Sequence, residues 1–243
     1  MKNQAEARLD RIDPMLTTSL RDHVHKALRM AIIAGRFPPQ SRLNERQLAE
    51  DLGVSTTPLK EALRQLESEG LVSTLPRRGV VVLYGRARAE EMILARAALE
   101  SMLAHLAARR ALPENTDELE ATMAAMSLAT KQGDADQLIS LNETFHDCVH
   151  QASRCDYLSR LIERQQFYDS STRRIIHANP EEREAALGEH IAIGQAIVKG
   201  DAIAAEQAMR QHVLRSGDVY ITRVFPSQAD PAASLLGSTL ASH

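Results

Sequence analysis

The feature that most constrains this fold is a change of hydrophobic period near residue 70. Before it, apolar residues recur at helical spacing in three short blocks, which end at Gly35, Gly53 and Gly70. After it, two β-prone runs, 71–75 and 80–83, flank a four-residue turn. Three short helices followed by a hairpin predict a winged helix-turn-helix, whose last helix enters the major groove of DNA.

Capping residues predict where the second and third helices begin. Asn44 can cap the second helix, with Gln47 placed to bond back to it. Thr57 is a good N-cap for the third helix and Pro58 a good first residue, and this recognition helix should end at Gly70.

The remainder of the chain predicts an all-helical domain. From Arg86 onward the sequence lacks strand patterns, and Pro, Gly and Asn divide it into helical blocks. We expect a mainly α protein, with a C-terminal antiparallel bundle of about six helices at 89–110, 114–132, 135–152, 157–177, 181–199 and 202–222. The expected organisation is an N-terminal arm (1–18), the winged helix-turn-helix (19–85), the helical domain (86–225) and a flexible tail (226–243).

Charge is distributed unevenly along the chain. Residues 1–85 hold 13 Lys and Arg against 10 Asp and Glu, whereas the remaining residues hold 16 against 22, which together give the formal net charge of −3. A polyanionic partner should therefore bind the N-terminal third of the chain. The sequence also lacks an apolar run long enough to span a membrane and an apolar secretory core, which predicts a cytoplasmic protein without a membrane partner.

The N-terminal third resembles a known family. The run GRFPPQSRLNERQLAEDLGVSTTPLKEALRQLESEGLV, followed by PRRGVVV, is similar to the DNA-binding domain of GntR regulators over nearly all of residues 19–83. The resemblance implies that Arg46 contacts double-stranded operator DNA. That family usually has Arg where this chain has Thr56 and Lys60, so a bidentate contact to guanine is replaced by a hydroxyl, a methyl and a simple positive charge.

Other candidate DNA contacts come from residue chemistry. Ser55 and Thr57 can donate hydrogen bonds to phosphate at the start of the recognition helix, and a wing tip can enter the adjacent minor groove. The alternative for Arg77 and Arg78 in the wing is that they are only solvated, as adjacent arginines in a turn often are. The candidate set is Arg46, Ser55, Thr56, Thr57, Lys60, Arg77, Arg78 and Gly79.

The helical part resembles the FCD ligand-binding domain over about Glu90 to Ser216, a domain of the GntR subgroup that responds to small organic acids. The segment RAALESMLAHLAARRA is similar to its first helix. This resemblance implies that Arg96 faces the cavity and anchors an effector carboxylate. The alternative is that Arg96 and Glu100 form an ordinary exposed i,i+4 pair. Since aromatic residues are few, a small polar anion is expected rather than a large ring.

The segments NETFHDCVH and EHIAIGQAIVKGDAIAAEQAMRQH resemble the metal-binding parts of that domain. They imply that Asn142, His146, His190 and His212 are metal ligands, with Asn142 and His146 on one helix face. Three imidazoles and one oxygen favour zinc, with nickel or manganese as alternatives, and leave positions for water or an effector. The family more often has Asp at Asn142, which predicts weaker metal binding. Asp147 and His150, which lie nearby on the same helix, are alternative candidates for a substitute ligand.

Together these features predict a homodimeric regulator, a repressor controlled by a small carboxylate, which places two recognition helices on successive half-sites. Two alternatives remain. A metal-dependent hydrolase would need a general base, but Glu143 and Glu189 each point about 100° away from the putative ligand next to them on the helix, and no HExxH motif occurs. A repressor with a purely structural metal would need no effector.

Overall fold

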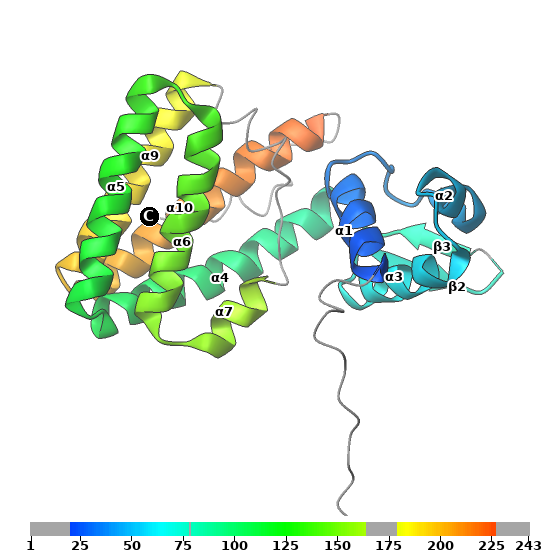
Figure 1. The fold of residues 1–243 in the computed structure, drawn as a ribbon, viewed down its shortest axis with the longest axis horizontal. Coiled ribbons are helices and arrows are strands. Elements are labelled where there is room, and N and C mark those ends of the chain that lie inside the picture. The colour runs from blue at the N-terminus through cyan, green and yellow to red at the C-terminus, as the bar shows by residue number, and fades with distance from the viewer. Residues whose placement is uncertain (1–19, 78, 164–178, 227–243) are drawn as a thin grey trace, which may run out of the picture. The chain divides into compact units, whose positions relative to one another are not determined.

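The structure is a computed structural model that describes residues 20–77, 79–163 and 179–226 (Figure 1). Two compact units make up the chain: one contains the residues up to Arg29 and Gln40–Val82, and the other contains Met30–Pro39 and the residues from Leu83 on. Several predictions lie outside the described residues: the N-terminal arm, nearly all of the tail, the wing residue Arg78 and residues 164–177 of the helix predicted at 157–177.

The first unit is a winged helix-turn-helix, as predicted. Its helices are α1 (Leu20–Ile33, of which the last turn belongs to the second unit), α2 (Glu45–Asp51) and α3 (Thr56–Ser68). Its strands are β1 (Arg42–Leu43), β2 (Val72–Leu75) and β3 (Gly79–Val82), in the antiparallel order β1-β3-β2. Leu75 pairs with Gly79 to close the wing, and Arg42 pairs with Val81. The sequence did not predict β1, because two residues carry no period.

The helix starts of this unit agree only partly with the prediction. Asn44 caps α2, since its Oδ1 accepts a hydrogen bond from the Gln47 backbone N–H at 3.2 Å. The Gln47 side chain donates forward to Asp51 at 2.8 Å instead of bonding back. The prediction that Thr57 caps α3 was wrong, because the N-cap is Ser55. Pro58 is still accommodated, since backbone N–H groups of a first turn lack helical partners.

A partly buried ion-pair network attaches α3 to α1. Glu69, the C-cap of α3, lies 2.6 Å from His25 Nε2 and accepts a hydrogen bond from Arg29 Nε at 2.9 Å. Burial alone would raise the pKa of Glu69, but the hydrogen bonds and charges of His25 and Arg29 bring it below its usual value. The apolar face of α3 completes the core with Leu59, Ala62, Leu63 and Leu66.

The second unit is a helical bundle, as predicted. Its described helices are α4 (Arg86–Arg110), α5 (Pro113–Gln132), α6 (Ala135–Ser153), α7 (Asp156–Glu163), α9 (Pro180–Val198) and α10 (Ala202–Val224). Helix α4 packs against α10 and α6, while α5 packs against α6 and α9 (Figure 1). Short connections join α5 to α6 and α9 to α10, which makes each pair antiparallel. Among the described residues, none of the helices has the length and apolarity to cross a membrane.

Two glycines allow close helix packing in this bundle. A Cβ added to Gly217 on α10 would lie 2.5 Å from Cγ2 of Ile93 on α4. A Cβ added to Gly194 on α9 would lie 2.3 Å from Sδ of Met123 on α5. The absence of a side chain therefore sets the α4–α10 and α5–α9 distances.

A buried tyrosine pair ties the segment Met30–Pro39 to the end of α10. Tyr220 donates a hydrogen bond to the carbonyl of Ile33 at 2.8 Å, and its oxygen lies 2.7 Å from that of Tyr84. Phe225 packs against both rings, with centroid distances of 6.0 and 6.4 Å. All of these residues belong to the second unit.

Candidate functional site: a nucleic-acid interface and a metal centre

The predicted DNA-binding residues of α3 lie on one exposed surface. Thr56, Thr57 and Lys60 are exposed on the first turns, opposite the buried leucines of the same helix. Ser55 is exposed as well, and its hydroxyl makes no capping hydrogen bond within the described chain. Arg46 on α2 is 87 % exposed and forms an ion pair with Glu50 at 3.4 Å. These side chains have the solvent access that a DNA contact requires.

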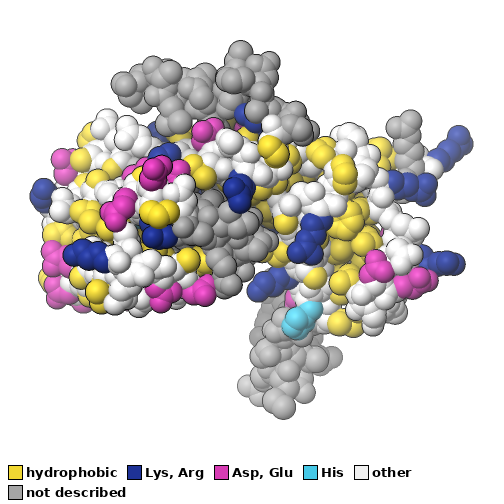
Figure 2. Space-filling view, turned by 90° about the horizontal axis from the view of Figure 1, so that it is seen from above, with side chains coloured by type: hydrophobic (Ala, Val, Ile, Leu, Met, Phe, Trp, Pro, Cys, Tyr) yellow, Lys and Arg dark blue, Asp and Glu magenta, His cyan; other side chains and the backbone are white. Residues whose placement is uncertain are grey.

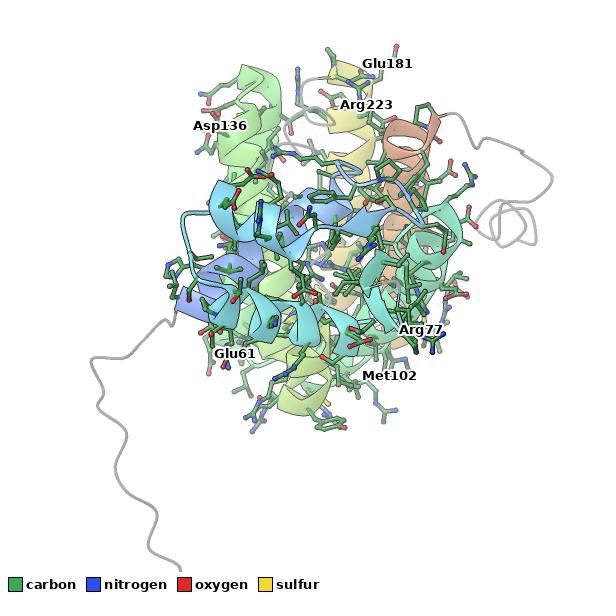
Figure 3. The ribbon with its side chains drawn as sticks, turned by 90° about the vertical axis from the view of Figure 1, so that its right-hand side faces the viewer. Glu61, Arg77, Met102, Asp136, Glu181 and Arg223 are labelled. Atoms are coloured by element: carbon green, nitrogen blue, oxygen red, sulfur yellow. The ribbon has the colours of Figure 1, made fainter. Side chains whose placement is uncertain are left out.

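The wing presents a further basic group. Arg77 is exposed at its tip with a φ of 63°, and Gly79 follows with a φ of 72°. Figure 3 shows Arg77 at the wing and Glu61 on α3. Figure 2 shows Lys and Arg side chains projecting from the surface of this unit. This basic surface suits a phosphate backbone.

Two basic residues that sequence reasoning did not single out belong to this surface. Arg64 is exposed on α3, one helical turn after Lys60. Arg42 on β1 extends along the wing, with its Nε 3.3 Å from the position of a Cβ on Gly79. A pocket of about 460 Å³ lies there, lined by Arg42, Leu43, Asn44, Glu45, Arg46 and Gly79. The i,i+4 spacing from Lys60 could have revealed Arg64, whereas Arg42 depended on the unpredicted strand β1.

Three of the four predicted metal ligands meet inside the helical unit. His146 of α6, His190 of α9 and His212 of α10 are all buried, and each offers a ligand atom within 4.8 Å of the others. The rings of His190 and His212 have centroids 4.4 Å apart, and those of His146 and His212 are 5.6 Å apart. Asn142 lies one turn before His146 and is partly exposed.

Hydrogen bonds to these rings indicate which nitrogen could bind an ion. His190 Nδ1 lies 2.7 Å from the Ala186 carbonyl oxygen, and His212 Nδ1 lies 2.8 Å from a Glu189 carboxylate oxygen. Because these oxygens only accept hydrogen bonds, Nδ1 must carry the proton in both rings. In the neutral form of each ring the lone pair is then on Nε2, the nitrogen that would bind a metal.

The charge states in the cluster suit a metal ion. Burial lowers the pKa of His146 to about 4, despite the raising effect of Glu100, so this ring is neutral at pH 7. Burial alone would raise the pKa of Glu189, but hydrogen bonds from His212 and Arg215 lower it. A neutral His146 near the ionised carboxylates of Glu100 and Glu189 suits a divalent cation, which binds the neutral form of imidazole.

Arg96 and Glu100 form a partly buried pair rather than the exposed pair that was the alternative prediction. Glu100 is 0 % exposed, and it accepts a hydrogen bond from Arg96 Nη2 at 2.8 Å. Its other oxygen lies 2.9 Å from His150 Nε2 and 3.4 Å from His146 Nδ1. Although burial would raise the pKa of Glu100, His146, His150 and Arg96 hold it well below its usual value. Glu100, His146 and His150 thus form a second group of potential ligands, which shares His146 with the first.

Two family models match the chain and cover both units. "Bacterial regulatory proteins, gntR family" matches residues 20–82, and "FCD domain" matches residues 91–215, which is half of the chain. This chain belongs to the GntR family. It is 30 % identical over 192 residues to YdhC of Bacillus subtilis, an uncharacterized HTH-type transcriptional regulator, with 78 % of this chain and 84 % of that protein covered.

Other GntR relatives agree with this assignment. McbR of Escherichia coli, an HTH-type transcriptional regulator, is 31 % identical over 150 residues, which cover 61 % of this chain and 68 % of McbR. The solved structure of E. coli McbR/YncC has a TM-score of 0.61 and 24 % identity, and the match covers 85 % of this chain and 99 % of that one. The E. coli transcriptional repressor RspR is 26 % identical over 198 residues, covering 81 % of this chain and 87 % of RspR.

This GntR-family chain is therefore a DNA-binding transcriptional regulator and not an enzyme. The hydrolase alternative also lacks support in the site. The hydrolase would have two candidate bases. Glu189 is hydrogen-bonded to His212 and Arg215, and Glu143 is exposed on α6. The regulator prediction is confirmed.

Proposed function

We propose that this regulator is a cytoplasmic, homodimeric repressor whose operator affinity is controlled by a small organic acid bound beside a divalent metal ion. The observation that carries the proposal is the buried cluster of His146, His190 and His212, whose ligand atoms lie within 4.8 Å of one another. Burying three polar rings costs free energy unless their nitrogens have hydrogen-bond or metal partners. The match to the FCD domain supports the same interpretation.

The donor set favours zinc, with nickel or manganese as alternatives. Three neutral imidazoles suit a borderline cation, and the amide oxygen of Asn142 is the proposed fourth ligand. Asn142 carries no charge, so we expect lower affinity than a carboxylate would give. A bound ion would supply a positive charge with open positions, to which the carboxylate of the acid can bind.

Arg96 is the proposed second anchor for the acid. Its guanidinium is bonded to Glu100 and its side chain is 14 % exposed. An acid that reaches Arg96 must therefore share this guanidinium with Glu100 or displace it. This competition favours small, strongly acidic ligands that also bind the ion, since one contact alone would not offset the lost ion pair.

On the DNA side, we propose that the exposed start of α3 reads the major groove while the wing tip follows the adjacent minor groove. A symmetric dimer would place two such units on successive half-sites. The proposed contacts are those predicted from the sequence, namely Arg46, Ser55, Thr56, Thr57, Lys60, Arg77, Arg78 and Gly79, with Arg42 and Arg64 added from the structure.

Metal binding is tested first. Protein stripped with chelator is titrated with zinc, nickel or manganese by calorimetry, together with His190→Ala. The matched control is His105→Ala, because His105 on α4 bonds to Glu206 and is not part of the cluster. Wild type and His105→Ala should bind one ion per chain, and His190→Ala should not. Absence of binding to wild type would refute the proposed metal site.

Effector control is tested on the metal-loaded protein. Its melting temperature is measured against a panel of mono- and dicarboxylates, because a ligand that binds only the native state raises it. An acid that raises the melting temperature should release the protein from duplexes that it selects out of a random pool, and chelator should abolish both effects. Metal binding without any response to an acid would favour the alternative of a purely structural metal.

A further inference from the structure

In two rings of the histidine cluster, Nδ1 lies near a carboxylate, and each carboxylate is bonded to an arginine. One chain of contacts runs from Arg215 through Glu189 to His212. The other runs from Arg96 through Glu100 to His146. The first pair comes from α10 and α9 and the second from α4, so the two arrangements share no helix.

The first arrangement is closely bonded. Glu189 Oε2 lies 2.8 Å from His212 Nδ1 and accepts a second hydrogen bond from Arg215 Nη2 at 3.0 Å. Arg215 Nε donates to the other Glu189 oxygen, so the guanidinium forms a bidentate pair with the carboxylate. Arg215 also donates from Nη1 to Glu182 at 2.6 Å. The Glu189 carboxylate is therefore fixed in position before it meets the ring.

The second arrangement is more deeply buried and looser. Glu100 is fully buried between Arg96 Nη2 at 2.8 Å and His150 Nε2 at 2.9 Å. His146 Nδ1 lies 3.4 Å from the same Glu100 oxygen that contacts His150, and this distance is longer than a normal hydrogen bond. A modest rotation of the ring would complete the bond.

Such partners have a known physical effect on a metal site. A metal-bound histidine usually donates its other N–H to a carboxylate or carbonyl, which fixes the tautomer, orients the ring and makes the ligand more basic. A buried carboxylate also needs a cation of its own when no ion is bound, and an arginine supplies it. Both requirements are met by each of the two arrangements.

We propose that Arg215–Glu189 and Arg96–Glu100 are positioning pairs for the metal centre, which hold His212 and His146 with Nε2 directed to the ion. The inference rests on the metal site proposed above. It gives Arg96 a structural task in addition to, or in place of, anchoring an acid. It also makes Glu189 the more important of the two carboxylates, because its contact with the ring is shorter.

The test compares zinc affinity by competition with a chromophoric chelator in Glu189→Gln, Glu100→Gln and two controls. Glu182→Gln is the control for the first, because Glu182 bonds to the same arginine but contacts no cluster histidine among the described pairs. Glu90→Gln is the control for the second, because Glu90 is a buried partner of Arg86 on the same helix α4. We expect both test variants to weaken zinc binding by about 10- to 100-fold, with Glu189→Gln the weaker binder, and both controls to stay within about twofold of wild type.

A second measurement reports the tautomers of the rings directly. In metal-free wild type, ¹⁵N-edited spectra of the imidazole rings should show His190 and His212 as Nδ1–H tautomers, and Glu189→Gln should give His212 a mixture of tautomers. A merely structural ion pair would not change this signature. Unchanged zinc affinity in both test variants, or an Nε2–H tautomer for His212, would overturn the positioning role and leave the metal site intact. Failure of wild type to bind zinc, nickel or manganese would instead refute the proposed function on which this inference rests.

Discussion

Replacing Gly217 with alanine should destabilise the helical unit although alanine is the better helix former. The added Cβ would lie 2.5 Å from Cγ2, 3.0 Å from Cδ1 and 3.2 Å from Cγ1 of Ile93. Ile93 is only 1 % exposed, and its branched Cβ restricts the side chain to few rotamers. The methyl group therefore cannot be accommodated unless α4 and α10 move apart.

The magnitude follows from two opposing effects. Overpacking a well-filled core costs about 1–3 kcal/mol. Replacing glycine by alanine inside a helix stabilises it by about 1 kcal/mol. The net expectation is a loss of up to about 2 kcal/mol, and since each kcal/mol lowers Tm by roughly 2–4 °C in a chain of this size, Tm should fall by several degrees.

The assay is thermal unfolding followed by calorimetry, with two other glycines as comparisons. Apart from the adjacent residues and the nearby backbone of α9 itself, nothing in the described chain lies within 4 Å of a Cβ on Gly188, so Gly188→Ala should raise the stability by up to about 1 kcal/mol. Gly194→Ala should fall between the two, because its clash is with the flexible end of Met123.

A double variant separates the clash from other effects. Ile93→Ala removes all three atoms that a Cβ on Gly217 would meet, so Gly217→Ala should cost less in that background than in wild type. The expected coupling is about 0.5–3 kcal/mol. If Gly217→Ala raised Tm as much as Gly188→Ala, or if its cost did not depend on Ile93, the close packing of α4 and α10 would be refuted.

Three further predictions concern the winged unit. Gln40 has a φ of 65°, so Gln40→Gly should raise the stability by about 0.5–1 kcal/mol in urea unfolding, whereas Gln40→Ala keeps the strain and should not. The pKa of Glu69 is lowered in the folded state, so its contribution of about 1–2 kcal/mol is present above its usual value of 4.5 and is lost as pH falls through the folded pKa. Glu69→Gln should therefore lower the stability at pH 7 and flatten its decline in acid, and an unchanged acid limb would contradict this. Lys60→Ala and Arg64→Ala should each weaken binding to all duplexes and reduce the slope of log K against log salt by about 1, as measured by fluorescence anisotropy; a salt slope equal to that of wild type would exclude the residue from the interface.

Local rules predicted much of the winged unit correctly. Asn44 caps α2 because the capping geometry depends on residues three apart, and the wing forms because a β-prone run stands on each side of a turn. The start of α3 was misplaced because Ser55 and Thr57 are both good caps and the sequence alone does not decide between them. The strand β1 was missed because its pairing with β3 depends on residues some forty positions away.

The histidines of the candidate metal centre were predictable, but the contacts that support them were not. The resemblance identified His146, His190 and His212, and the structure brings these three together. The burial of Glu100 was not predictable, since an i,i+4 pair of Arg and Glu looks the same on a surface and in a core. The contact of Glu189 with His212 crosses from one helix to the next, and no local spacing specifies it.

The tyrosine pair at the end of α10 has a consequence for dissecting the protein. Because Tyr220 bonds to Ile33, and Met30–Pro39 belongs with the helices, the chain passes between the two units at three places: after Arg29, after Pro39 and after Val82. A fragment that starts at residue 86 would lose Tyr84 and the carbonyl of Ile33, and would leave the hydroxyl of Tyr220 in an opened apolar site. After a single proteolytic cut near residue 85, the two pieces should stay bound together, because the segment Met30–Pro39 on the first piece still packs on α10 of the second.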